Sequence, residues 1–148
     1  LGTHVLLSSI VFLPYMFGHW GLVYWLEDAR LVWQLPPHFL WAIVEQVCLI
    51  ALPEEFFFRG YMQTQFDRVW GTPYRLWGAP IGIGLVCAAA LFALCHVHNG
   101  GPVRLIVFFP GLFYGWLRAR SDTILVPVMY HAASNLLMHI MLRSLVRP

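Results

Sequence analysis

Three long apolar runs without aspartate, glutamate, lysine or arginine constrain this chain more than any other feature. They cover Val5–Leu26, Ala79–Val97 and Thr123–Leu142. Each run approaches or exceeds the ~20 residues that an α-helix needs to cross the hydrocarbon core of a bilayer. Apolar residues make up 59% of the 148 positions, charged residues only 11%, and the mean hydropathy is +0.67. Water-soluble domains of this size rarely have such a composition, so we expect an integral membrane protein.

Two further segments are apolar but contain charged residues or a helix-breaking proline, which are unfavourable in contact with lipid. Phe39–Tyr61 contains three glutamates and an arginine, and Leu105–Leu117 is short and is broken at Pro110. Both can cross a membrane if their polar groups face a cavity inside the protein. With them, the sequence predicts an all-α, multi-pass transmembrane helical bundle of about five spans. The expected helices are Val5–Leu26, Phe39–Arg68, Ile81–Val97, Val103–Leu117 and Thr123–Arg143.

Small residues recur at helical spacing in two of the expected helices. Ala89 and Ala93 lie one turn apart in one helix, and Gly111 and Gly115 lie one turn apart in the next. Small side chains at this spacing let helix backbones approach closely in a membrane. We therefore expect these two helices in the interior of the bundle.

The charged and sulfur-containing residues exclude some kinds of site and partner. The net charge of +2 is spread over short loops and forms no basic patch, so nucleic acid is not an expected partner. Cys48, Cys87 and Cys95 lie inside apolar runs without metal-ligand spacing, and we interpret them as small core residues. We expect no disulfide.

Two adjacent glutamates lie within one of the apolar segments. On a helix, Glu55 and Arg59 form an i,i+4 pair with the acid on the N-terminal side, which is the favourable orientation. Glu54 points about 100° away from Glu55, so Arg59 can neutralise one carboxylate and not the other. A buried ion pair that joins helices would explain Glu55 and Arg59 but would leave Glu54 without a partner. We therefore favour a structural role for Glu55 and a catalytic role for Glu54.

Two histidines and an asparagine supply further polar groups. His96 lies one turn after Phe92, whose ring we expect beneath the imidazole, and His131 and Asn135 share one face of the last helix. Together with a carboxylate, these groups can activate water and stabilise an oxyanion, which suffices for amide hydrolysis without a metal or a covalent nucleophile. Taken singly, His96 could be a core histidine, and His131 with Asn135 could join helices by hydrogen bonds.

Three motifs, in this order and spacing, resemble those of the CPBP family of membrane proteins, named for CAAX proteases and bacteriocin-processing enzymes. The family pattern is Glu-Glu-x-x-x-Arg, then Phe-x-x-x-His, then His-x-x-x-Asn/Asp. It stands here as EEFFFRG (Glu54–Gly60), FALCH (Phe92–His96) and HAASN (His131–Asn135). The resemblance covers about residues 39–142 and implies a glutamate-dependent intramembrane endopeptidase.

The resemblance also implies a role for each motif residue. Catalysis would use Glu54, His96, His131 and Asn135, with support from Glu55 and Arg59. The first glutamate and first histidine would activate water, and the second histidine and the asparagine would stabilise the oxyanion. We expect a membrane-anchored or lipidated protein or peptide as substrate, no cofactor or metal, and a place in the bacterial inner membrane. Residues 1–38 would form an N-terminal span and connecting loop, and residues 39–148 the protease core.

Two other interpretations of the same residues stay open. Glu54, His96 and His131 offer carboxylate and imidazole ligands, so a metal-dependent hydrolase is an alternative within the enzymes. A non-catalytic membrane protein, such as an immunity factor or a transporter fragment, could also keep a polar core for packing or proton relay.

Overall fold

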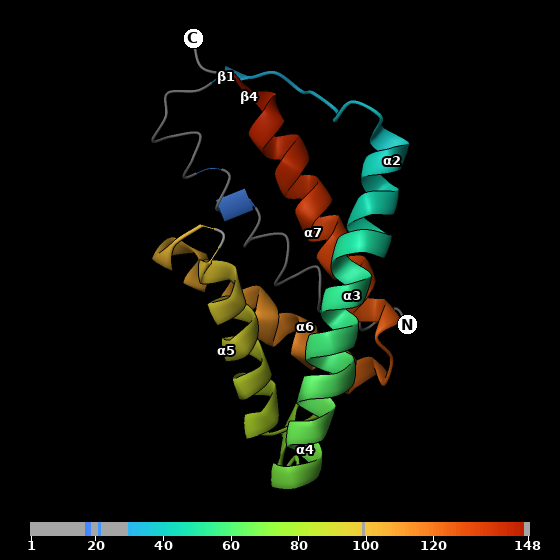
Figure 1. Ribbon diagram of the computed structural model, residues 1–148, viewed down its shortest axis with the longest axis vertical. Coiled ribbons are helices and arrows are strands. Elements are labelled where there is room, and N and C mark those ends of the chain that lie inside the picture. Colours follow the sequence, from blue (N-terminus) through green and yellow to red (C-terminus); the bar gives the residue numbers. More distant parts are fainter. Residues whose placement is uncertain (1–16, 19–20, 22–29, 99, 147–148) are drawn as a thin grey trace. The chain divides into compact units, whose positions relative to one another are not determined.

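The structure is a computed structural model that describes residues 17–18, 21, 30–98 and 100–146 (Figure 1). Most of the predicted span Val5–Leu26 lies outside the described residues. The chain divides into two compact units, of which one comprises Leu1–Ile43 with Ala133–Pro148 and the other Val44–Ala132. The described elements are mostly helical, as the sequence predicts.

A long helical segment contains both glutamates of the first motif (Figure 1). Its consecutive elements are α2 (Phe39–Val44), η1 (Glu45–Ala51), α3 (Leu52–Glu55), η2 (Phe56–Gln63) and α4 (Thr64–Trp70). The stretches η1 and η2 are π-helical, which the expectation of a regular α-helix over Phe39–Arg68 missed. Pro53 lies between them and has no N–H for an α-helical hydrogen bond. Single π turns inside helices often lie at functional sites. The two stretches flank α3, which makes the glutamates of this turn candidates for a functional site.

A hairpin joins α4 to the next helix. Strands β2 (Tyr74–Leu76) and β3 (Ala79–Ile81) pair antiparallel, with Arg75 opposite Pro80. The helix α5 (Ile83–Val97) therefore begins later than predicted and is a shorter apolar helix. It packs beside η2 and α4 (Figure 1). The expectation of an all-α fold is thus corrected by short strands in the connectors.

The following helices bring the small residues into the interior of their unit. After the 3-10 turn η3 (Pro102–Val107), α6 (Phe108–Ser121) packs along α5. A methyl group added at Gly111 would lie 3.3 Å from the Ala89 side chain, and one added at Gly115 would lie 2.9 Å from Gln63 Oε1. The predicted close approach of these helices is confirmed.

The helix α7 (Leu125–Ser144) follows α6, and a short strand comes directly after its last residue. Among the described residues, α7 is long and apolar enough to cross a membrane. Strand β1 (Arg30–Leu31) pairs with β4 (Leu145–Val146), and the buried Ser144 accepts a hydrogen bond from Gln34 N through its hydroxyl oxygen at 2.9 Å.

Apolar and polar side chains are distributed differently from those of a water-soluble domain. In the unit Val44–Ala132, Leu49, Phe56 and Leu94 are all more than half exposed, whereas the charged Glu55 and Arg59 have 0% exposure. Apolar residues on the outside and charges inside suit a bilayer, where a lipid-facing charge is costly. Cys48 and Cys95 are exposed as well, so their interpretation as core residues is wrong.

Candidate active site

Glu55 is fully buried and is held between two side chains. Arg59 Nη1 donates a hydrogen bond to Glu55 Oε1 at 2.9 Å, and His131 Nδ1 lies 2.8 Å from the same oxygen. Because a carboxylate accepts hydrogen bonds, Nδ1 of His131 carries a hydrogen. The pair of Glu55 with Arg59 confirms the sequence prediction. The second partner, His131 on α7, was not predicted.

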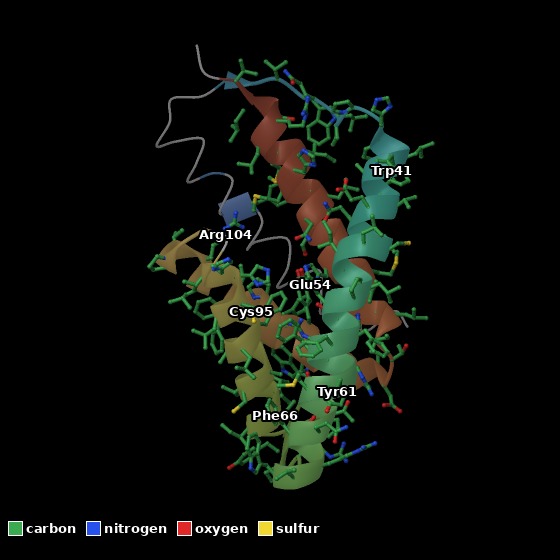
Figure 2. The ribbon with its side chains drawn as sticks, viewed as in Figure 1. Trp41, Glu54, Tyr61, Phe66, Cys95 and Arg104 are labelled. Carbon is green, nitrogen blue, oxygen red and sulfur yellow. The ribbon has the colours of Figure 1, made fainter. Side chains whose placement is uncertain are left out.

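Glu54 has the opposite environment. Its side chain is 33% exposed, and its buried Oε2 atom has no hydrogen-bond partner among the described residues. That atom lies 4.0 Å from His96 Nε2 and 3.8 Å from His131 Nε2. Both separations exceed the length of a direct hydrogen bond. At this distance a water molecule can bridge two polar groups. Figure 2 shows Glu54 in the middle of the long helical segment.

His96 is oriented by its own helix. Its Nδ1 lies 2.8 Å from the carbonyl oxygen of Phe92, so Nδ1 is the donor, since a carbonyl can only accept. In the neutral ring, Nε2 then has a free lone pair on the side of Glu54. The Phe92 ring lies 4.4 Å from the imidazole, which confirms the expected packing.

Two aromatic rings enclose the buried charges. The Arg59 guanidinium lies 4.3 Å from the Phe92 ring centre and 5.5 Å from that of Tyr114, distances at which the ring faces attract a cation. Tyr114 also stacks on the His131 ring at 5.0 Å and 17°. No motif of the sequence predicted a role for Tyr114, although its position three residues after Gly111 places it near the same close-packed face of α6.

Hydrogen bonds to the glycine carbonyls of α6 anchor the segment η2. Arg59 Nη2 donates to the Gly111 carbonyl, and Gln63 Nε2 donates to the Gly115 carbonyl, both at 3.1 Å. Gln63 is 2% exposed, and its role was not predicted from the sequence either. Its spacing of one turn from Arg59 was the available signal, because such residues share a helix face.

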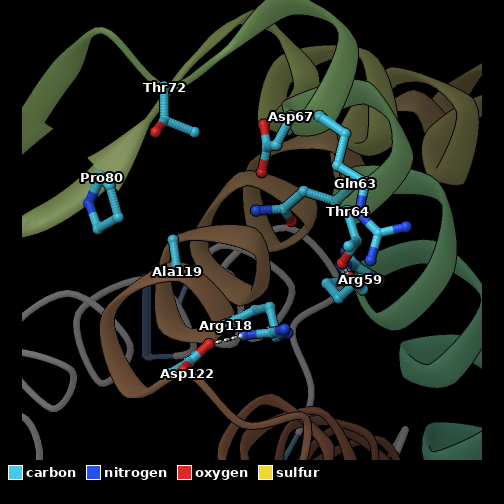
Figure 3. Close-up of a pocket in the computed structure, with 10 residues that line it drawn as sticks. Arg59, Gln63, Thr64, Asp67, Thr72, Pro80, Arg118, Ala119 and Asp122 are labelled. Carbon is cyan, nitrogen blue, oxygen red and sulfur yellow. Dashed lines mark hydrogen bonds and ion pairs between the residues drawn. The ribbon is translucent and has the colours of Figure 1, made fainter.

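A pocket of about 280 Å³ lies beside the face of the long helical segment that carries Arg59 and Gln63 (Figure 3). Arg59, Gln63 and Asp67 line it from the long helix, and Arg118 and Asp122 line it from α6 and its end. Arg118 Nη1 donates to Asp122 Oδ1 at 3.0 Å (Figure 3). Neither Glu54 nor the two motif histidines line this pocket, so it is separate from the carboxylate and imidazoles described above.

Asn135 lies one turn after His131 on α7, in the unit that contains Ala133–Pro148, and it is partly exposed. In the described part of the chain, no group of three or more His, Cys, Asp or Glu residues could hold a metal ion. The structure therefore brings together the first two motifs and His131 within one unit.

Comparison with protein families identifies a match that includes all three motifs. The family described as type II CAAX prenyl endopeptidase, Rce1-like, matches residues 36–137. No curated protein and no solved structure is similar enough to the chain to count as a match. The family match covers more than half of the chain.

Proposed function

Because the chain belongs to the Rce1-like family of type II CAAX prenyl endopeptidases, we propose that it is an intramembrane endopeptidase in which Glu54 activates water. The family is a protease family whose members are integral membrane proteins. The observation that carries the proposal is the environment of Glu54, whose Oε2 lacks a hydrogen-bond partner within the described residues and lies within 4.0 Å of two imidazole nitrogens. The proposal includes a multi-pass bundle of about five spans and a membrane-associated protein or peptide substrate.

The tautomer of His96 suggests how water is held. With its hydrogen on Nδ1, neutral His96 presents a lone pair at Nε2, and ionised Glu54 presents lone pairs at Oε2. A water molecule between them donates a hydrogen to each, which leaves the oxygen lone pairs directed away from both bases. Glu54 takes the proton as the water oxygen bonds to the scissile carbonyl carbon, and that proton then passes to the leaving amine as the C–N bond breaks.

The oxyanion of the tetrahedral intermediate requires hydrogen-bond donors. We assign this role to His131 and Asn135. Nδ1 of His131 already donates to Glu55, so donation from Nε2 requires the doubly protonated ring. With that proton, the positive charges of Arg59 and His131 balance the negative charges of Glu54 and Glu55. Glu55 and Arg59 thus support the site through charge as well as through position.

The test is cleavage of a prenylated C-terminal peptide by the purified protein in lipid vesicles. Glu54→Gln keeps the shape of the side chain and removes the base, so the variant should stay folded and lose cleavage. Glu45→Gln is the matched control, because Glu45 is an exposed glutamate on the same helical segment. Cleavage by Glu54→Gln at the wild-type rate would refute the proposal.

A metal-dependent hydrolase is the alternative that the sequence left open, although Glu54, His96 and His131 do not form a metal-binding group among the described residues. The peptide assay separates the two candidates if it is repeated after chelation. Loss of cleavage that zinc restores would favour the metal enzyme.

A further inference from the structure

Tyr114 contacts both side chains that bind the buried carboxylate of Glu55. Its ring lies nearly parallel to the His131 imidazole, with ring centres 5.0 Å apart and planes at 17°. The Arg59 guanidinium carbon lies 5.5 Å from the centre of the same ring. Tyr114 is 3% exposed, so its ring has few alternative positions.

The hydrogen bond to Glu55 does not by itself orient the His131 ring. It fixes Nδ1 at 2.8 Å from Glu55 Oε1 but leaves the imidazole free to tilt about that bond. The face of Tyr114 lies against one side of the ring, and Phe92 approaches edge-on at 5.8 Å and 85°. These aromatic contacts restrict the plane of the imidazole and thereby the direction of Nε2, which lies 3.8 Å from Glu54 Oε2.

We propose that Tyr114 is a positioning residue that acts through His131, holding Nε2 of the imidazole toward Glu54. The inference rests on the proposed protease function. It assigns the effect to the flat ring of Tyr114 and not to its hydroxyl, because the stacked face makes the contact with His131.

The neighbouring residue on α6 provides a matched control. Phe113 contacts Tyr130 and Trp116, at ring distances of 5.7 and 6.2 Å. Its ring also lies 6.0 Å from that of Tyr114 but does not contact His131 or Arg59 in any ring pair or cation contact of the described residues, so it tests loss of a neighbouring ring without loss of the stacked face. Exchange of either ring for methionine keeps an apolar side chain of adaptable shape and removes the flat face. Tyr114→Phe is the conservative variant, because it keeps the ring and removes the hydroxyl.

The first experiment is peptide cleavage by these variants in lipid vesicles, with kcat and KM measured separately. Misplacement of a catalytic group by about 1 Å can reduce rate about a hundredfold. We expect Tyr114→Met to lower kcat by about tenfold to a hundredfold with KM changed less than about threefold. Tyr114→Phe and Phe113→Met should retain kcat within about threefold. Equal kcat for wild type and Tyr114→Met, or an equal loss in Tyr114→Phe, would overturn the inference.

The second experiment does not depend on turnover. Nitrogen NMR of histidine-labelled protein in detergent reports whether the surroundings of each imidazole nitrogen are fixed, and His131→Asn identifies the His131 signals. Wild type and Tyr114→Phe should show one narrow Nε2 signal at His131, whereas Tyr114→Met should show a broadened Nε2 signal. An unchanged signal in Tyr114→Met would contradict the positioning role. If Tyr114→Met does not fold, Tyr114→Leu takes its place in both experiments with the same expected results.

Failure of this inference can be distinguished from failure of the proposed function. If Glu54→Gln abolishes cleavage while Tyr114→Met matches wild type, the protease assignment stands and the role of Tyr114 is refuted. If Glu54→Gln cleaves as well as wild type, the proposed function itself is refuted.

Discussion

Removal of the Arg59 guanidinium should destabilise the protein more than removal of any exposed charge. Arg59 is fully buried, donates to Glu55 Oε1 at 2.9 Å and to the Gly111 carbonyl at 3.1 Å, and faces the Phe92 ring at 4.3 Å. The variant Arg59→Met fills most of the volume but leaves Glu55 without its cationic partner. Breaking a buried pair in this way costs about 3–5 kcal/mol.

The second partner of Glu55 narrows the expected loss in the free energy of unfolding. His131 still donates to the carboxylate in this variant, so we expect the lower end of the range, about 3 kcal/mol. That loss corresponds to roughly a hundredfold decrease in the ratio of folded to unfolded protein. Cleavage should decrease as well, because Glu55 and His131 lose their support.

Unfolding in detergent, followed by circular dichroism during denaturant titration, measures this effect. Arg68→Met is the control, because Arg68 is an exposed arginine on the same helical segment, and its loss should change the free energy of unfolding by less than about 0.5 kcal/mol. The double variant Glu55→Gln with Arg59→Met should be less destabilised than the sum of the single changes, by about 0.5–3 kcal/mol. Equal stabilities of Arg59→Met and Arg68→Met would refute the reasoning.

Three further predictions use the same preparation. Asn135→Ala should fold normally and cleave about a hundredfold more slowly, because loss of one oxyanion donor has an effect of this size in other enzymes. A kcat equal to that of wild type would show that Asn135 is not an oxyanion donor. Chelation should leave cleavage by the purified protein unchanged, and a loss that zinc reverses would contradict a water-activating glutamate without metal. Gly115→Ala should lower stability by about 1–3 kcal/mol, because the new methyl group would lie 2.9 Å from Gln63 Oε1 and 3.0 Å from Leu85 Cγ. Gly60→Ala, whose nearest contact would be 3.5 Å, should retain its melting temperature, and equal melting temperatures for both variants would argue against this crowding.

Helical spacing in the sequence predicted two kinds of contact: those between residues one turn apart on one helix, and the close approach of two helices at small residues. The pair of Glu55 with Arg59 and the ring of Phe92 beneath His96 follow from a separation of one turn. The bond between Glu55 and His131 joins residues 76 positions apart, and periodicity says nothing about which faces of two distant helices meet. Tyr114 escaped notice for the same reason, since its importance lies in what it contacts on α7 and η2.

The backbone departures from the predicted helices have local causes. Pro53 lacks the N–H that a regular α-helix uses and lies in the short α-helical turn α3 between two π-helical stretches, a change that hydrophobic patterning does not report. The strands β2 and β3 have only three residues each, so alternation is too short to distinguish strand from loop. The predicted division of the chain at residue 38 and the role of Asn135 stay predictions.

The two glycine carbonyls that accept from Arg59 and Gln63 restrict how the helices can slide. Donors and acceptors are each spaced by one turn, so a shift of α6 along η2 by one turn, about 5.4 Å, would align only one of the two pairs. The displaced donor and acceptor would remain buried without partners, at about 1–3 kcal/mol each. Sliding by less than a turn would break both bonds. The two bonds therefore oppose sliding between η2 and α6, and we expect the opening that admits a peptide to Glu54 to involve other helices.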